Sequence, residues 1–107
     1  MLRYFVRHSS TEDFQRVQTP PRDNVWIHGD VVDNDELQLL ATSYGMDFNI
    51  LNDVLDKNEL PRVEQRGDEL YVFVRTAQRT KKGEIITTPV LLAVKGTVFV
   101  NVSTAAT

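Results

Sequence analysis

Apolar and polar residues alternate along much of the chain with the two-residue period of β-strands. Near the N-terminus, residues 2–7 show this alternation, and residues 25–28 are predicted to form a second short strand closed by Gly29. Residues 62–66 and 70–76 flank Gly67-Asp68, a residue pair typical of a tight turn. Because such turns join antiparallel neighbours, this part of the chain predicts a β-hairpin.

Two further strands are predicted near the C-terminal end. Residues 85–94 are rich in β-branched and apolar residues, and residues 97–102 follow Lys95-Gly96, another tight-turn signal. Pro89 lies inside the first of these strands and lacks the N–H that a central strand would use. We therefore expect a bulge or a sheet edge at Pro89.

The middle of the chain has helical spacing instead. Asp33 followed by Glu36 forms a capping-box pattern. The apolar residues after it fall on one helical stripe: Leu37, Leu40, Ala41 and Tyr44. Gly45 provides the left-handed position that ends a helix, and Asp47 provides the cap of the next one. The apolar residues of that second helix are Phe48, Leu51, Val54 and Leu55. Pro61 prevents its continuation.

The segment between the first two strands is predicted as a turn. Ser10 and Asp13 form a capping arrangement for a short turn that carries Phe14 and Val17. Pro20-Pro21 would end any helix begun there.

Together these elements predict an α/β fold with a mixed sheet of about six strands, in the order ββααββββ. Strand 70–76 has apolar residues on both of its faces, which is typical of a strand covered on both sides. The two helices are consecutive and are expected to cover one face only. A sheet that is apolar on both faces needs helices on both. We therefore expect that the helices covering the other face follow these 107 residues and are absent from this sequence. Trp26 is predicted to anchor the core.

Composition narrows the function classes. A chain of 107 residues fits one domain, and its net charge of −3 disfavours general binding to nucleic acid. The absence of cysteine excludes disulfides and thiolate sites. The longest purely apolar run, residues 90–94, is far shorter than the ~20 residues of a membrane-spanning helix.

Candidate chemistry is sparse. His8 and His28 show no partner at ligand spacing, and no nucleophile is paired with a base, so the sequence does not predict an enzyme. The acidic residues around the first helix start, Asp30, Asp33, Asp35 and Glu36, are explained by helix capping. Asp53 has Asn49 four residues before it and Asp56 three residues after it, a spacing that places all three on one helix surface. Two carboxylates and an amide suit Mg²⁺, although the same pattern also describes an ordinary solvated helix face.

One stretch resembles a known family. Its parts are Asp53-Val54-Leu55-Asp56, then Pro61-Arg62-Val63-Glu64, then Leu70-Tyr71-Val72-Phe73-Val74. They are similar to the cytoplasmic N-terminal domain of the CorA-type magnesium transporter family. Gly45-Met46-Asp47 looks like the Gly-Met-Asn signature of the pore in that family, but it lies between two amphipathic helices and is interpreted as two helix caps. Arg62 and Glu64 are expected to organise the chain after the second helix.

The resemblance implies a function for the chain. It would be residues 1–107 of a homopentameric transporter of Mg²⁺ (or Co²⁺, Ni²⁺ or Zn²⁺) in the bacterial inner membrane, without the stalk helix and the membrane helices. Asp53 matches the aspartate that contributes half of a weak divalent-cation site between protomers, with Asp56 and Asn49 as further candidates. The alternative is a stand-alone binding or scaffold module of the same fold. The sequence leaves the ion and the direction of transport open.

Overall fold

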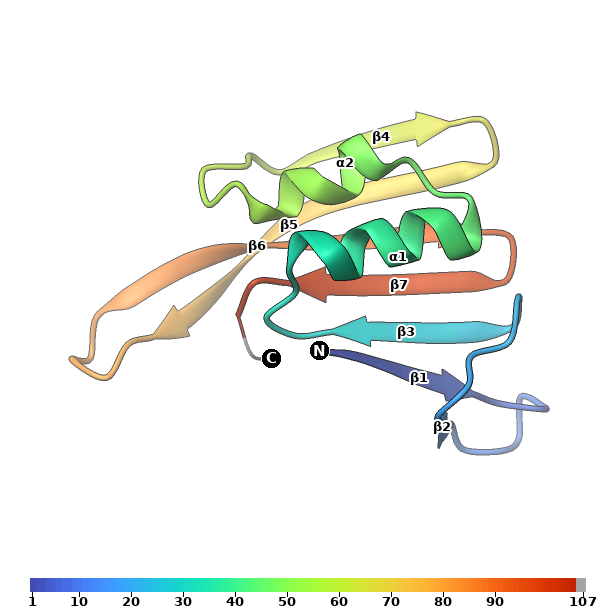
Figure 1. Cartoon of the computed structure of the whole chain (residues 1–107). Helices are drawn as coiled ribbons and strands as arrows, with labels where there is room; N and C mark the ends of the chain where they lie inside the picture. Colours follow the sequence, from blue (N-terminus) through green and yellow to red (C-terminus); the bar gives the residue numbers. More distant parts are fainter. Residues whose placement is uncertain (106–107) are drawn as a thin grey trace.

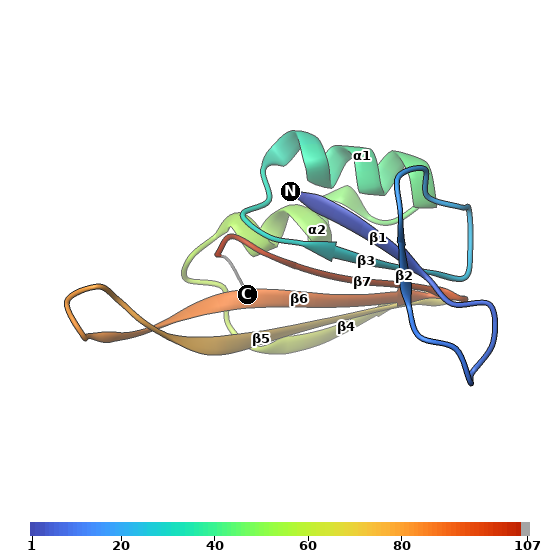
Figure 2. The same ribbon diagram turned by 90° about the horizontal axis from the view of Figure 1, so that it is seen from below.

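The computed structural model describes residues 1–105, which form one β-sheet with the helices on one of its faces (Figures 1 and 2). The strands are β1 (Leu2–Val6), β2 (Gln15–Val17), β3 (Val25–Gly29), β4 (Arg62–Arg66), β5 (Glu69–Arg79), β6 (Ile85–Lys95) and β7 (Val98–Ser103). The helices are α1 (Asn34–Tyr44), α2 (Phe48–Asn52) and a short 3-10 turn, η1 (Asp53–Leu55). The predicted α/β class and the placement of both helices on one face are confirmed.

Local hydrogen bonds set the two helices as the sequence predicts. The Asp33 side chain accepts from the backbone N–H of Glu36, and the Glu36 side chain accepts from the backbone N–H of Asp33, which completes the capping box. Gly45 ends α1 with φ 65°, and Asp47 caps α2 by accepting from Ile50 N. These contacts span three or four residues and therefore need no tertiary partner.

The sheet has an order that the sequence does not reveal. Within residues 1–105 its seven strands are arranged β2-β1-β3-β7-β6-β5-β4. β3 and β7 pair in parallel, with Val25 opposite Val98, whereas every other neighbouring pair is antiparallel. The last strand of the chain therefore lies in the middle of the sheet.

The core lies between the helices and one face of the sheet. Its members from the helical segment include Leu37, Leu40, Leu51 and Val54, all almost fully buried. Its members from the sheet include Ile27, Tyr71, Phe73, Leu91, Val100 and Val102. The opposite face carries Phe99, Leu70 and Val94, whose side chains are exposed. The face that carries them has no helix over it within residues 1–105 (Figure 2).

Three expectations need correction. Residues 15–17 form strand β2 rather than part of a turn, because they pair with β1, where Val17 lies opposite Tyr4. This adds a third strand before the helices and gives seven strands in residues 1–105, where the sequence predicts about six. Trp26 is not a core residue: Val25 and Ile27 take the helix side of β3, so Trp26 points to the uncovered face. There it packs against Phe5, with ring centroids 4.8 Å apart.

Pro89 lies at a sheet edge and not at a bulge. β5 and β6 pair without interruption from Glu69 opposite Lys95 to Arg79 opposite Ile85. β7 accompanies β6 only as far as Val90, so from Pro89 toward Ile85 no strand within residues 1–105 pairs with this side of β6. The far part of the β5–β6 hairpin consequently extends beyond the rest of the sheet, at the left of Figure 1.

Candidate functional site

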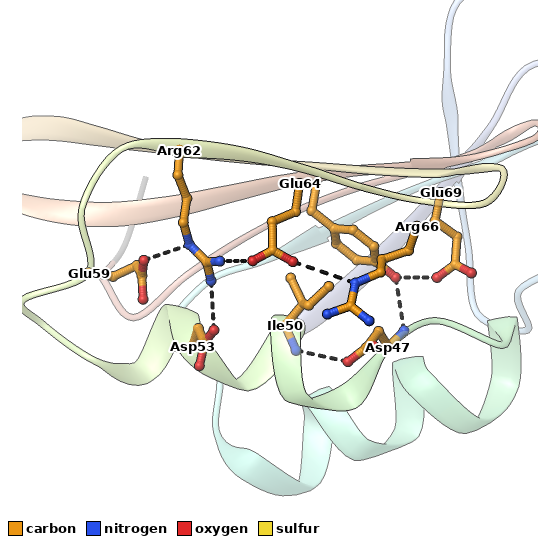
Figure 3. Close-up of polar contacts among 9 residues, drawn as sticks. Asp47, Ile50, Asp53, Glu59, Arg62, Glu64, Arg66 and Glu69 are labelled. Carbon is orange, nitrogen blue, oxygen red and sulfur yellow. Dashed lines mark hydrogen bonds and ion pairs between the residues drawn. The ribbon is translucent and has the colours of Figure 1, made fainter.

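A cluster of charged side chains lies where η1 leads into β4 (Figure 3). We call it the Arg62 cluster, and it consists of Arg62, Asp53, Glu59 and Glu64. The guanidinium of Arg62 donates from Nη2 to Asp53 Oδ2 at 2.6 Å and from Nε to Glu59 Oε1 at 2.8 Å. A third bond runs from Nη1 to Glu64 Oε1. One cation therefore joins three carboxylates from η1, the following loop and β4.

The strand register and an aromatic ring hold Arg62 in this place. Arg62 is opposite Phe73 of β5, whose ring belongs to the core, so the Arg62 side chain lies on the helix-covered face. Its guanidinium carbon is 4.5 Å from the Phe73 ring centroid, within the range of a cation–π contact. These contacts agree with the prediction that Arg62 and Glu64 organise the chain after the second helix.

The electrostatics of the cluster keep Arg62 charged. Burial by itself would lower the pKa of Arg62, but the hydrogen bond and charge of Glu59, together with the charges of Glu64 and Asp53, raise that pKa above its ordinary value. Arg66 adds a second cation, with its Nε 3.7 Å from Glu64 Oε2. Arg75 of β5 adds a third, with its Nη1 donating to the Glu59 carbonyl at 2.8 Å, so three guanidinium groups accompany the three carboxylates.

The structure gives the predicted cation ligands different surroundings. Asp53 begins η1 and binds Arg62, while its side chain remains 46% exposed. Asp56 has left the helix at the end of η1 and accepts from the backbone N–H of Asn58 at 2.9 Å. Asn49 is exposed on α2. Among residues 1–105, no three His, Cys, Asp or Glu side chains are grouped closely enough to hold a metal ion. Asp53 as half of a site shared with another chain stays a prediction.

Sequence reasoning missed two members of this arrangement. Glu59 lies in a loop, outside the periodic segments from which strands and helices are predicted. Its position three residues before Arg62 is nevertheless compatible with a local ion pair. The Phe73 ring contact depends on the pairing of β4 with β5, which relates residues eleven apart. A hairpin register counted from the Gly67-Asp68 turn would have placed these two residues opposite each other.

A second polar contact joins the start of α2 to the sheet (Figure 3). The Tyr71 hydroxyl accepts from the backbone N–H of Asp47 at 2.8 Å and donates to the Glu69 carboxylate. The Tyr71 side chain is fully buried. Burial and the hydrogen bond to Glu69 both raise the pKa of Tyr71 above its ordinary value of 10.0.

Tyr71→Phe is expected to lower the free energy of unfolding by about 1.5 kcal/mol, because it leaves the Asp47 N–H without its acceptor. The wild-type chain should also lose stability as pH rises above 10.0, since the unfolded tyrosine releases its proton before the folded one does. Urea unfolding at pH 7 and at about pH 11 measures both effects. Tyr44→Phe is the control for the loss at pH 7, since the Tyr44 hydroxyl donates at the surface, to the Pro21 carbonyl. An equal alkaline loss in the Tyr71→Phe variant and in wild type would contradict this role of Tyr71.

The uncovered face carries a separate polar chain that the sequence did not indicate. Trp26 Nε1 donates to Asn101 Oδ1 at 2.6 Å, and Asn101 Nδ2 lies 2.7 Å from His28 Nδ1. His28 Nε2 is 3.0 Å from Asp30 Oδ1. Because the indole can only donate, it orients the Asn101 amide so that Nδ2 donates to His28 Nδ1. The predicted structural role of His28 agrees with this geometry. A hollow of about 420 Å³ beside Trp26 is lined by Phe14, Phe99 and Arg7 among others.

Comparison with solved structures shows which known folds this one resembles. The soluble domain of CorA from Methanocaldococcus jannaschii superposes with a TM-score of 0.78 at 20% identity, over 99% of this chain and 41% of that chain. The complete CorA magnesium transporter of the same organism gives a TM-score of 0.78 at 15% identity, over 100% of this chain and 33% of that chain. The ZntB cytoplasmic domain from Vibrio parahaemolyticus RIMD 2210633 gives 0.73 at 8% identity, over 98% of this chain and 44% of that chain. This chain thus spans less than half the length of each of these relatives.

Sequence comparison assigns the family. A search of curated proteins finds no match. None of the helices in residues 1–105 combines the length and the apolar character needed to cross a bilayer. The family model described as CorA-like Mg²⁺ transporter protein matches residues 22–106, which include α1, α2 and the Arg62 cluster. Because this match covers most of the sequence, the chain belongs to the CorA-like Mg²⁺ transporter family.

Proposed function

We propose that this chain is the cytoplasmic ion-sensing domain of a divalent-cation transporter and that Asp53 supplies half of a regulatory Mg²⁺ site between adjacent protomers. The observation that carries the proposal is the family match over residues 22–106, in a family of transporters rather than enzymes. Two CorA structures, one of the soluble domain and one complete, share the fold over nearly the whole chain. The parent would be a homopentamer of the bacterial inner membrane, attached to it through helices outside these 107 residues.

A carboxylate in this position has the properties that an interfacial sensor needs. Asp53 is on the surface, 46% exposed, at the end of α2, and its carboxylate is one of three grouped around Arg62. Mg²⁺ keeps most of its water ligands and needs only one or two protein carboxylates. A site whose carboxylates come from two chains is broken when the chains separate. The ion would therefore bind the closed assembly better than the open one, and this difference in affinity is what allows it to hold the gate closed.

The gene tests the first half of this proposal. Sequencing past codon 107 is expected to reveal two apolar segments of about 20 residues, with Gly-Met-Asn after the first. A stop codon at that point would remove the pore and leave a stand-alone binding module of the same fold.

The isolated chain tests the second half. It holds one half-site, so Mg²⁺ titrated into it should bind more weakly than the submillimolar range. The titration is followed by NMR at the side-chain carboxylate carbon of Asp53, at constant ionic strength. A submillimolar, Asp53-dependent affinity in this chain alone would show that the site does not need a second protomer.

A further inference from the structure

The carboxylate proposed to bind the regulatory cation already has a cation in its own chain. Arg62 Nη2 lies 2.6 Å from Asp53 Oδ2, a short charge-assisted hydrogen bond. Figure 3 shows the Asp53 carboxylate directed at this guanidinium. A divalent cation that is to bind Asp53 must compete with Arg62 for it.

The three carboxylates around Arg62 differ in how firmly they are held. The Glu59 side chain is 14% exposed and the Glu64 side chain 29%, whereas the Asp53 side chain is 46% exposed. Asp53 is thus the member that water reaches most easily and that loses least by turning away from Arg62. Arg62 would keep its bonds to the other two carboxylates after such a turn.

The packing beneath Arg62 also favours a turn of Asp53 away from Arg62 rather than a movement of Arg62. The guanidinium lies over the Phe73 ring, 4.5 Å from its centroid, and that ring is almost fully buried. Arg62 is held from below by Phe73 and from the side by Glu59. Asp53 is therefore the partner of this ion pair that we expect to turn outward.

We propose that Arg62 is a positioning residue that acts as an internal competitor of the regulatory cation, so that Asp53 exchanges between Arg62 and a divalent ion. This inference rests on the proposed function of Asp53. Its consequence is a weakened cation affinity, because only the conformation with Asp53 turned outward can bind the ion. A partly exposed ion pair of this kind reduces the affinity by about fivefold.

The test compares Arg62→Gln with Arg66→Gln in the chain of 107 residues. Both variants remove one positive charge near Glu64, but Arg66 is 60% exposed and pairs at 3.7 Å with Glu64 rather than with Asp53. Mg²⁺, added as the chloride at constant ionic strength, is titrated against each variant while the Asp53 carboxylate carbon is followed by NMR. We expect Arg62→Gln to bind about fivefold more tightly than wild type. Arg66→Gln should change the affinity by less than about twofold, because the charge of Arg66 acts on Asp53 only from a distance, where salt screens it.

Two further variants show which carboxylate binds the ion and whether the gain depends on the guanidinium of Arg62. In the double variant Arg62→Gln with Asp53→Asn, which has no Asp53 carboxylate, the titration is followed at the Glu59 and Glu64 side-chain carboxylate carbons, and the gain should disappear. A gain that survives Asp53→Asn would place the ion on Glu59 and Glu64 and would overturn the proposal. Equal affinities of the Arg62 and Arg66 variants would overturn it as well. Arg62→Lys keeps the charge but cannot bridge three carboxylates, so it should lie between wild type and Arg62→Gln, and it decides the question if Arg62→Gln does not fold.

The same titrations distinguish this inference from the function on which it rests. If Mg²⁺ shifts the Asp53 carbon with the same affinity in wild type and in Arg62→Gln, then Asp53 binds the ion and Arg62 does not compete. If Mg²⁺ at saturating concentration leaves the Asp53 carbon unshifted in every variant, the proposed Asp53 half-site itself fails.

Discussion

Phe73→Ala is expected to lower the free energy of unfolding of this chain by about 4 kcal/mol, the range typical for a buried phenylalanine. The Phe73 side chain is 2% exposed and belongs to the core between the helices and the sheet. Its removal leaves a cavity and also takes away the ring beneath the Arg62 guanidinium. Since small domains have a total stability of roughly 5–15 kcal/mol, much of the population should become unfolded on mild heating.

The measurement is urea unfolding followed by far-ultraviolet circular dichroism, with Phe99→Ala as the control. Phe99 is the same residue type in the middle of the same sheet, but it lies on the uncovered face and is 39% exposed. Its replacement should cost less than about 1.5 kcal/mol, because much of its surface is already in contact with water. Equal losses in the two variants would show that the face under the helices is not the principal core.

Arg62→Gln is expected to lower the free energy of unfolding by about 2 kcal/mol, the second largest effect. It leaves three carboxylates close together without their shared cation, and the Glu59 side chain is only 14% exposed. The loss is smaller than for a fully buried ion pair, because water still reaches Asp53 and part of Arg62.

Arg66→Gln provides the matched control for this stability change, with an expected loss below about 0.5 kcal/mol, since a single exposed contact contributes little. Both variants should be unfolded in urea at pH 7 and again in added salt. The Arg62 effect should persist at about 0.5 M salt, because close, partly buried pairs are screened less than surface charges. An Arg62 effect that vanishes in salt would mean that Arg62 acts only through the general surface field.

Local sequence signals predicted the helical part of the fold well. The capping box of Asp33 and Glu36, the left-handed Gly45 and the Asp47 cap all appear where they were predicted. The hairpin around Gly67 is also present, with Arg66 opposite Glu69. Each of these features depends on hydrogen bonds or turns within a few residues, so the residues that form it are neighbours in the sequence.

The two wrong predictions, for residues 15–17 and for Trp26, concern features that are set by contacts between segments far apart in the sequence. β2 contains one apolar residue, Val17, and exists because β1 provides a partner for its backbone. Trp26 is predicted to anchor the core, yet in a strand the face on which a side chain lies alternates from one residue to the next. Val25 and Ile27 have the parity that faces the helices.

The sequence by itself determined the α/β class, the two capped helices, the hairpin, and the motif around Asp53 that identifies the family. Only the tertiary structure decided the strand order, with β7 parallel to β3 in the middle of the sheet, and the partner of Asp53. The reason is that caps and turns are formed by neighbouring residues. The Arg62 cluster, in contrast, requires η1, the following loop and β4 to meet above Phe73 of β5, and their meeting depends on how the whole core packs.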